Sequence, residues 1–500
     1  FDKELGELEL QEVAMIAGLA QAPGRADPYK DIDAAKARRD DVLERMARAG
    51  FVPEQDAKEA QGRAIELSPP EQQYGRIAGW HTERVRQQLA ADLPQAYRRG
   101  GMEVPTSAEP VLSIVGEQLA TEWLSKRWKD QERPEVGALV WDHMTGYVEM
   151  TIGGSSFQRT KFDRSTQACR QPGSVFKPVV YTAALERDAI TPGTPLRDAP
   201  IAEFDWDLEV HWKPKNSGRS FRGAVLAVDA LASSLNAPAV NVLDRVGTPA
   251  IVELARRVGI TSKLTEVRPL ALGSSCVTQL ELTRLYASIA ENGRAVSDIF
   301  AVSVTREGSS LMDQASPYDP YLRSDHALDR MVAHSSGRDY IVDERSAFLM
   351  KTMLRAVVER GTGVAARRLS RPVAGKTGTT NSNTDAWFIG FSPRVAAAVW
   401  LGHDDPTRTL GRRADGGRVA LPLWMRLVSV AEGERESGDL IGEPPEGIVR
   451  VRVDRETGLL ATAGAGGAVD LFFKSGSEPT ESSGRGRDVP VDVHRMTRDF

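Results

Sequence analysis

The sequence predicts an α+β fold in which an antiparallel sheet is flanked by helices, with a small helical group at the N-terminus. Three observations predict it. Two strand-like runs, 137–141 and 147–152, flank a turn at 143–146. Helical patterns dominate from 174 to about 290. A second pair of strand-like runs, 385–391 and 394–401, follows. A chain that forms strands first, then helices and then strands again is typical of an α+β domain.

Composition narrows the class of function. With 500 residues and 41% hydrophobic side chains, the chain exceeds one compact core, so we expect two or more domains. A net charge of −5 provides no overall basic field, which argues against nucleic-acid binding. No apolar run approaches the ~20 residues needed to span a bilayer. The start at Phe1 lacks an initiator methionine and a signal-peptide pattern, so we expect a fragment of a longer protein.

The N-terminal elements are predicted from helical periodicity and its stop signals. A helix over 9–21 is followed by Pro23 and Gly24, and a second helix, with Asp33 as a plausible cap, ends at Gly50. A short third helix over about 55–64 completes a group too small to be a domain. The remaining boundaries follow from composition: a polar, Arg-rich linker over 65–106, a main domain over 107–430, and an appendage with a partly disordered tail over 431–500.

Later elements follow the same patterns. We expect a helix over 111–123, a strand over 300–305, a helix over 345–359 and a strand-like piece at 448–453. Residues 376–380 should form an exposed strand.

Two cysteines and seven histidines give little support to metal or redox chemistry. Cys169 and Cys276 show no C-x-x-C spacing, and we expect both to be unpaired packing residues. The histidines show no H-E-x-x-H or Cys/His spacing, so neither a metal ion nor a cofactor is predicted. His403-Asp404-Asp405 is interpreted as a turn with satisfied polar groups rather than as a cation site.

Three short motifs carry the chemistry. They are S-x-x-K at 174–177, S-x-N at 234–236 and K-T-G at 376–378, and the first two patterns occur once each. Each is weak alone, because a serine and a lysine one turn apart usually lie on a solvated helix face. Together and in this order they form a signature of acyl-serine enzymes. A second K-[S/T]-G, at 474–476, is interpreted as a surface turn.

The first motif pairs a nucleophile with a base. A serine hydroxyl needs a base within hydrogen-bonding reach, and Lys177 follows Ser174 at i+3 on the same helix face. Pro172 and Gly173 mark the helix start, where the helix dipole favours developing negative charge. A lysine with an ordinary pKa near ~10.4 cannot accept a proton at neutral pH. We therefore expect burial and a second cation, Lys376, to lower the pKa of Lys177.

The other two motifs are predicted to handle the leaving group and the substrate. Ser234 would relay a proton to the leaving amine, and Asn236 would orient Lys177 and the substrate amide. Lys376 would hold the substrate carboxylate.

The strand of the third motif is expected to line the substrate site. Thr377 and Thr379 would add hydroxyls for the carboxylate, with Gly378 between them. Backbone amides of Ser174 and Thr379 are candidates for an oxyanion hole, worth roughly 3 to 4 kcal/mol per donor. Among the tryptophans, Trp212 best fits substrate contact. The glycines of Gly361-Thr362-Gly363 should cap a helix and could shape the site.

These residues resemble a known family closely. Segments 170–178, 234–240 and 375–380 resemble the transpeptidase motifs of class A (bifunctional) penicillin-binding proteins, and 385–391 and 399–405 resemble the strands that follow the third motif. The resemblance implies the penicillin-binding, serine-transpeptidase fold. It also implies a peptidoglycan D,D-transpeptidase that cross-links stem peptides, is acylated by β-lactams and has other cell-wall synthesis proteins as possible partners.

The resemblance extends to the N-terminus. Residues 9–50 look like the last helices of the family's glycosyltransferase domain, whose acidic catalytic motifs find no counterpart here. We therefore expect no glycan polymerisation by this chain. The family also implies action in the periplasm, on the outer face of the cytoplasmic membrane, with an N-terminal anchor helix absent from this sequence.

Two alternative functions stay open. A β-lactamase shares the acylation machinery but adds a group that activates water for deacylation, and no such loop can be assigned here. A non-catalytic β-lactam sensor or scaffold could also keep the motifs, although no signalling region is evident.

Overall fold

The described residues fall into two units. This computed structural model describes residues 1, 3–21, 26–68, 77–129, 131–205, 210–216, 218, 220–319, 339–380, 382–433, 438–462 and 467–483. One unit spans Phe1–Arg76 and the other Ile77–Phe500. Within these ranges, no helix combines the length and apolar character needed to cross a bilayer.

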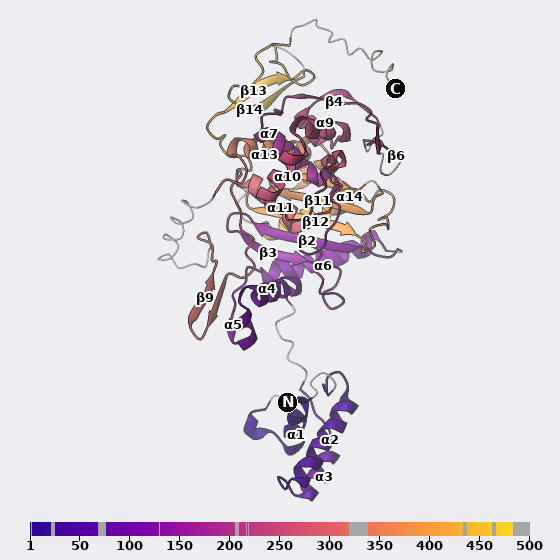
Figure 1. Ribbon diagram of the computed structural model, residues 1–500, viewed down its shortest axis with the longest axis vertical. Helices are drawn as coiled ribbons and strands as arrows, with labels where there is room; N and C mark the ends of the chain where they lie inside the picture. Colours follow the sequence, from indigo (N-terminus) through magenta and orange to yellow (C-terminus); the bar gives the residue numbers. More distant parts are fainter. Residues whose placement is uncertain are drawn as a thin grey trace. The chain divides into compact units, whose positions relative to one another are not determined.

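The smaller unit contains the three predicted helices. After a 3-10 turn at Leu5–Glu7 come α1 (Leu10–Leu19), α2 (Ile32–Arg48) and α3 (Glu54–Gly62) (Figure 1). Their buried core consists of Ala14, Leu43, Ala57 and Ala60.

The start of α2 differs from the prediction. Asp31, not Asp33, caps the helix, because its carboxylate accepts a hydrogen bond from Ala34 N at 2.9 Å. Asp31 has the extended backbone that a capping residue needs, whereas Asp33 already lies inside the first turn. Pro23 and Gly24, predicted to end the first helix, lie outside the described residues.

The segment predicted as a linker contains helices. Residues 79–99 form α4 (Gly79–Asp92) and α5 (Pro94–Arg99), and β1 (Met102–Glu103) pairs with β8 (Ser303–Arg306). Trp80, Val85 and Leu89 of α4 are buried. Only one face of α4 packs against the core, and the other faces carry many charged residues. The polar composition of the segment therefore led to the prediction of a linker.

A five-stranded antiparallel sheet forms the centre of the larger unit. Its order is β10-β11-β12-β2-β3. The bounds are Glu135–Asp142 for β2, Tyr147–Ile152 for β3, Ala374–Thr379 for β10, Asp385–Phe391 for β11 and Val395–Gly402 for β12. Both predicted pairs of strands are confirmed, and the two pairs join because β12 lies against β2.

Helices cover both faces of this sheet. On one face lie α6 (Pro110–Arg127) and α14 (Gly416–Glu432), packed against residues such as Val399 and Phe388. On the other face, residues such as Ile389 and Trp400 belong to a larger core shared with the remaining helices. These are α7 (Lys177–Glu186), α8 (Ala227–Ala232), α9 (Asn236–Val246), α10 (Thr248–Arg257), α11 (Gln279–Ala290) and α13 (Glu344–Arg360). α6 packs against β3 and α11 against β12 (Figure 1).

Short strands complete the larger unit. β4 (Pro195–Asp198) pairs with β7 (Gly223–Leu226), β5 (Glu203–Asp205) with β6 (Val210–Trp212), β8 with β9 (Ser309–Asp313), and β13 (Ile448–Asp454) with β14 (Ala468–Lys474). We call the β13/β14 hairpin and its connection, residues 448–474, the C-terminal hairpin. The tail predicted to be disordered lies largely outside the described residues.

The second K-[S/T]-G is a surface turn in part: Ser475 and Gly476 form an exposed turn, as predicted, whereas Lys474 is buried. Lys474 ends β14, is buried, and donates to Leu185 O at 2.7 Å and to Asp188 at 2.8 Å. The polar composition around it suggested exposure, but the lysine attaches the C-terminal hairpin to α7 and the loop that follows.

Candidate active site

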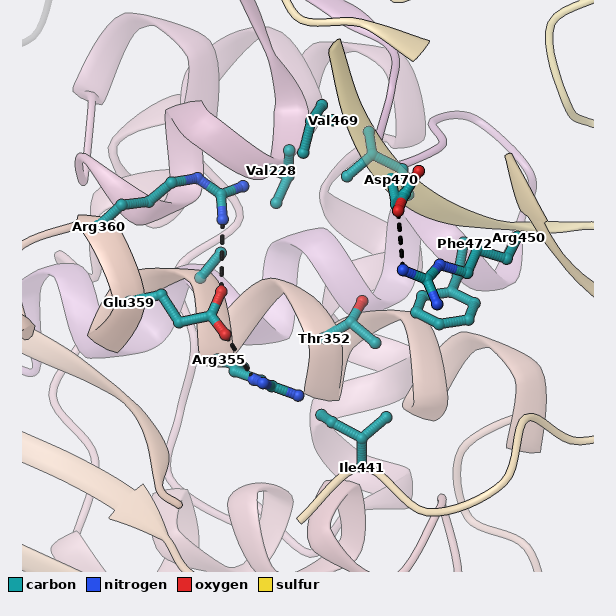
Figure 2. A pocket seen from close by; sticks show the side chains of 12 residues that line it. Val228, Thr352, Arg355, Glu359, Arg360, Ile441, Arg450, Val469, Asp470 and Phe472 are labelled. Atoms are coloured by element: carbon teal, nitrogen blue, oxygen red, sulfur yellow. Dashed lines mark hydrogen bonds and ion pairs between the residues drawn. The ribbon is translucent and has the colours of Figure 1, made fainter. Parts of the chain in front are cut away.

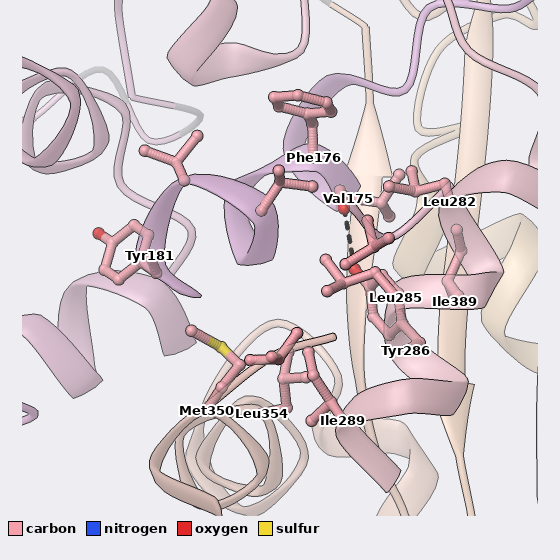
Figure 3. Packing of buried hydrophobic residues seen from close by; sticks show 14 of the residues in the cluster. Val175, Phe176, Tyr181, Leu282, Leu285, Tyr286, Ile289, Met350, Leu354 and Ile389 are labelled. Carbon is pink, nitrogen blue, oxygen red and sulfur yellow. Dashed lines mark hydrogen bonds between the residues drawn. The ribbon is translucent and has the colours of Figure 1, made fainter. Parts of the chain in front are cut away.

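Ser174 lies in a tight turn that the core holds in place. Gly173–Phe176 form a 3-10 turn that runs directly into α7, and residues at i and i+3 of such a turn eclipse one another. The backbone amide of Lys177 donates to Ser174 O, so the two residues lie one turn apart. Figure 3 shows Val175 and Phe176 packed in the large core, with Tyr286 Oη donating to Val175 O at 2.9 Å. The hydroxyl of Ser174 is half-buried, whereas Lys177 is fully buried.

The turn packs tightly against the strand of the third motif. Gly173 has φ +55°, and a Cβ there would lie 2.9 Å from Thr379 O. A Cβ on Gly378 would lie 2.7 Å from Pro172 O. Only glycine permits these backbone approaches. The amides of Ser174 and Thr379 consequently belong to neighbouring backbone segments.

The second motif occupies the junction of two helices. Ser234 follows the end of α8 and has φ +57°, a strained conformation for a serine. Its amide donates to Leu231 O at 3.0 Å. Asn236 then begins α9, and its amide donates to Asn216 Oδ1 at 2.8 Å. Both side chains are half-buried.

Lys177 contacts the second motif directly. Its Nζ donates to Ser234 O at 2.8 Å, Leu235 O at 2.9 Å and Asn236 Oδ1 at 2.8 Å, and lies 3.4 Å from Ser234 Oγ. Asn236, the residue predicted to orient Lys177, is thus in direct contact with the Lys177 amine. Asn236 is itself oriented, because its Nδ2 donates to Lys215 O at 2.7 Å.

Lys376 reaches the same serine from the sheet. Its Nζ donates to Ser234 Oγ at 2.8 Å and to Thr377 O at 3.0 Å. The Ser234 hydroxyl therefore lies between two lysine amines from different elements. Three motifs separated by 60 and 142 residues thus converge on one cluster.

Both lysines have lowered pKa values. Burial lowers the pKa of Lys177 well below its ordinary value, and the charge of Lys376 lowers it further, while Asp198 acts weakly in the opposite direction. Burial alone lowers the pKa of Lys376 to about 7. The three oxygens around Lys177 Nζ favour its charged form, but they are neutral groups and leave the buried charge without a contacting carboxylate. Burial and the charge of Lys376 therefore shift Lys177 toward its neutral form.

The strand of the third motif is buried rather than exposed. α13 and α14 pack on β10, so Lys376 is fully buried and Thr377 is 7% exposed. The hydroxyls of Thr377 and Thr379 contact the turn after α13 and the start of α14, respectively. Thr377 Oγ1 bonds Thr362 Oγ1 at 2.6 Å, and Thr379 Oγ1 accepts from Gly416 N at 3.0 Å. The bond to Thr362 places the Gly361-Thr362-Gly363 turn against this strand.

Trp212 lies in a strand rather than in a polar loop. It ends β6, is half-buried and packs against the large core. It lies three residues before Lys215, whose carbonyl holds Asn236.

The two cysteines are paired, contrary to the prediction. Cys169 and Cys276 form a disulfide with Cα atoms 5.2 Å apart. Adjacent to it, Arg170 and Val277 exchange backbone hydrogen bonds of 3.0 and 3.1 Å. The disulfide therefore ties the segment leading to Ser174 to the segment that precedes α11. A separation of 107 residues, with no local spacing pattern, gave the sequence no signal of the pairing.

Sequence reasoning also missed the supports behind the turn. Arg170 bonds Asp385 at 2.9 Å and lies over the Trp400 ring at 4.9 Å, and Trp387 Nε1 donates to Gln171 O at 3.0 Å. These supporting residues had only a weak signal in the sequence, because arginine, aspartate and tryptophan form similar contacts in many proteins. In the His403-Asp404-Asp405 turn, Asp404 pairs with Arg164, and across the described ranges no group of histidine, cysteine and acidic side chains could hold a metal ion.

Comparisons with known proteins identify the family. The penicillin binding protein transpeptidase domain matches residues 136–427, which is more than half of the chain. A transglycosylase domain matches 1–47, and the penicillin-binding protein 1A C-terminal domain matches 444–485. The chain belongs to the class A penicillin-binding proteins and is an enzyme of peptidoglycan synthesis.

Individual relatives agree with this assignment. Penicillin-binding protein 1A of Pseudomonas aeruginosa is 29% identical over 96% of this chain and 74% of its own length, and that of Rickettsia prowazekii is 28% identical over 99% and 74%. Among solved structures, penicillin-binding protein 1A from Haemophilus influenzae has a TM-score of 0.76 at 23% identity, covering 97% of this chain and 88% of its own. The PonA1 protein of Mycobacterium tuberculosis, in complex with penicillin V, has a TM-score of 0.59 at 20% identity, covering 73% and 95%.

Proposed function

We propose that the chain is a serine-type D,D-transpeptidase with Ser174 as nucleophile. Its substrates would be peptidoglycan stem peptides ending in D-Ala-D-Ala, and β-lactams would acylate the same serine. One observation carries the proposal: the Ser234 hydroxyl lies between Lys177 and Lys376, and Lys177 is one turn from Ser174.

Acylation begins with proton removal from Ser174. Neutral Lys177 accepts the Ser174 proton as Oγ attacks the carbonyl carbon between the two D-alanines. The carbonyl oxygen gains negative charge, and the amides of Ser174 and Thr379 are our candidates to stabilise it. Their backbone segments already lie in contact, as the Gly173 packing against Thr379 indicates.

The leaving group departs with a proton. When the peptide C–N bond breaks, the amine of the terminal D-alanine takes a proton from Ser234, which recovers one from Lys177. The acyl-serine ester is then attacked by an acceptor amine, whose proton returns through the same groups to Ser174 Oγ. The result is a new peptide bond and a regenerated hydroxyl.

Substrate binding is assigned to the third motif and its neighbours. Protonated Lys376 attracts the terminal carboxylate, and Thr379 still has its hydroxyl hydrogen to donate, because it accepts from Gly416 N. Thr377 is less accessible and is proposed to contribute through its position beside Gly378. Trp212 is proposed to form part of the substrate-contacting wall near Asn236.

The setting is proposed to be the outer face of the cytoplasmic membrane. Peptidoglycan synthesis by this family supports extracytoplasmic action, and the Cys169–Cys276 disulfide suits an oxidising compartment.

The test measures both half-reactions. With a synthetic peptide ending in D-Ala-D-Ala and an amine acceptor, the chain should release D-alanine and form the new amide, and Ser174→Ala should do neither. Penicillin should form a long-lived adduct. Rapid turnover of penicillin without amide formation would instead identify a β-lactamase. Acylation without any reaction of the peptide would indicate a sensor.

A further inference from the structure

The helix before the second motif is held by two arginines from distant parts of the chain. Asp229 lies in α8, and its carboxylate accepts from Arg455 at 2.8 and 3.2 Å and from Arg360 at 2.9 Å. We call these three residues the Asp229 clamp. Burial raises the pKa of Asp229, but the bonds from Arg455 and Arg360 outweigh it and keep the pKa below its ordinary value. The carboxylate is therefore charged at neutral pH, and its side chain is only 11% exposed.

The position of α8 determines the position of Ser234. Ser233 N donates to Asp229 O at 2.9 Å, and Leu235 N donates to Ala230 O at 2.9 Å. Ser234 between them has the strained φ of +57°, a conformation that persists only when its surroundings impose it. The end of α8 is the element that imposes it.

Arg360 connects the clamp to the strand of Lys376. It is the last residue of α13, and the turn that follows touches both α8 and β10. Thr362 N donates to Ala232 O at 3.0 Å, and Thr362 Oγ1 bonds Thr377 Oγ1 at 2.6 Å. A Cβ on Gly361 would lie 2.2 Å from Ala232 O, so this approach requires glycine.

Arg455 comes from the C-terminal hairpin and has a fixed backbone. The Asp454 carboxylate accepts from the amides of Glu456 and Thr457, both at 2.9 Å, and Arg455 N donates to Gly467 O at 3.1 Å. The hairpin is attached independently of the clamp, because Phe472 packs edge-on against Phe348 at 5.2 Å and Lys474 bonds Leu185 O. Arg455 is therefore presented to Asp229 by a rigid support.

The same hairpin offers a matched control. A pocket of about 310 Å³ lies between α13, α8 and the hairpin, and Figure 2 shows the Arg450–Asp470 pair at its edge. Arg450 bonds Asp470 at 2.7 Å within the hairpin, so both partners belong to one element. Its removal deletes an arginine and an ion pair from the hairpin while leaving the Asp229 clamp complete.

We propose that Arg455 is a positioning residue for acylation: through Asp229 it holds α8, and with it Ser234, where Lys177 and Lys376 can both reach the serine hydroxyl. The C-terminal hairpin is thereby part of the transpeptidase machinery, although its residues do not touch substrate. This inference rests on the proposed function of the site.

The experiment follows acylation of the whole chain by a fluorescent penicillin at several concentrations, which separates the limiting rate from the apparent binding constant. Arg455→Gln should lower the limiting rate by about tenfold with little change in apparent binding, because the site for the ligand is intact but proton transfer is misaligned. Asp229→Asn should act similarly. The double variant should be no slower than Asp229→Asn alone, because Arg455 is proposed to act only through Asp229.

Two controls separate positioning from stability. Arg450→Gln should acylate at the wild-type rate, and Arg455→Lys, which keeps the charge, should recover part of the loss. Melting temperatures of all variants are measured alongside. The inference would be overturned if Arg455→Gln were acylated at the wild-type limiting rate. It would also be overturned if Arg450→Gln lowered the limiting rate as much as Arg455→Gln does. Failure of the wild-type chain to be acylated at Ser174 would instead contradict the proposed function.

Discussion

At the scale of single residues, the site depends on how two buried amines share one hydroxyl. Lys177 and Lys376 both reach Ser234 Oγ, at 3.4 and 2.8 Å, and contacts with a carboxylate are absent from the described surroundings of both. Burial lowers the pKa of each amine, and the charge of Lys376 lowers the pKa of Lys177 further. Lys177 is therefore the amine suited to accept a proton, and Lys376 the one suited to attract an anion.

Replacing the base tests this division of roles. Lys177→Ala should reduce the rate of acylation by penicillin by about 10²- to 10⁴-fold, the usual contribution of a general base. Circular dichroism should show an unchanged fold. Lys351→Ala provides the control, because Lys351 is also a buried lysine, in α13, with a pKa lowered by burial to about 8. Preserved acylation in Lys177→Ala would mean that another group is the base.

The pH dependence of acylation should be bell-shaped. The rate rises with pH as Lys177 loses its proton, and it falls again as Lys376 loses the charge that attracts the substrate carboxylate, near its pKa of about 7. The second-order rate constant reports the free protein and shows both limbs. Lys376→Arg keeps the charge to high pH, so its profile should retain the rising limb and lose the falling one. A falling limb unchanged in Lys376→Arg would assign it to another group.

At the scale of elements, the site is built where a turn, a helix end and a strand contact one another. Local sequence predicted the strands and the helix start near the S-x-x-K motif because short apolar runs bounded by turn residues, and a proline-glycine pair, are visible in short windows. The contacts between elements were not visible. That Thr377 faces Thr362, or that α13 and α14 bury the strand of Lys376, follows only from how distant segments pack.

The disulfide is a covalent link between two distant segments that the sequence did not predict. Cys169→Ser with Cys276→Ser should lower the free energy of unfolding by about 2–4 kcal/mol and slow acylation, because the segment leading to Ser174 loses its tie to the segment before α11. Denaturant unfolding and the acylation rate measure the two effects. A reductant should reproduce them in the wild type and change nothing in the double variant. Equal unfolding free energies would show that the disulfide does not stabilise the fold.

At the scale of the whole molecule, the order of motifs predicted the chemistry and the family before any contact was known. The motifs can be recognised in the sequence because acyl transfer requires a hydroxyl, a base and a cationic group that binds an anion, and few residue types can supply each. The domain limits, by contrast, were predicted from composition. Composition did not predict the helices in residues 79–99 or the burial of Lys474, because a polar sequence can still bury one helix face or one amine. The role of the C-terminal hairpin lay beyond any sequence pattern.

The most direct measurement is to locate the covalent bond. The chain is treated with penicillin, digested, and its peptides are identified by mass spectrometry. We predict one penicilloyl group per chain, on the hydroxyl of Ser174, and at least about a hundredfold slower formation of this adduct in Lys177→Ala. An adduct on any other residue, or a protein that stays unmodified while correctly folded, would contradict the account.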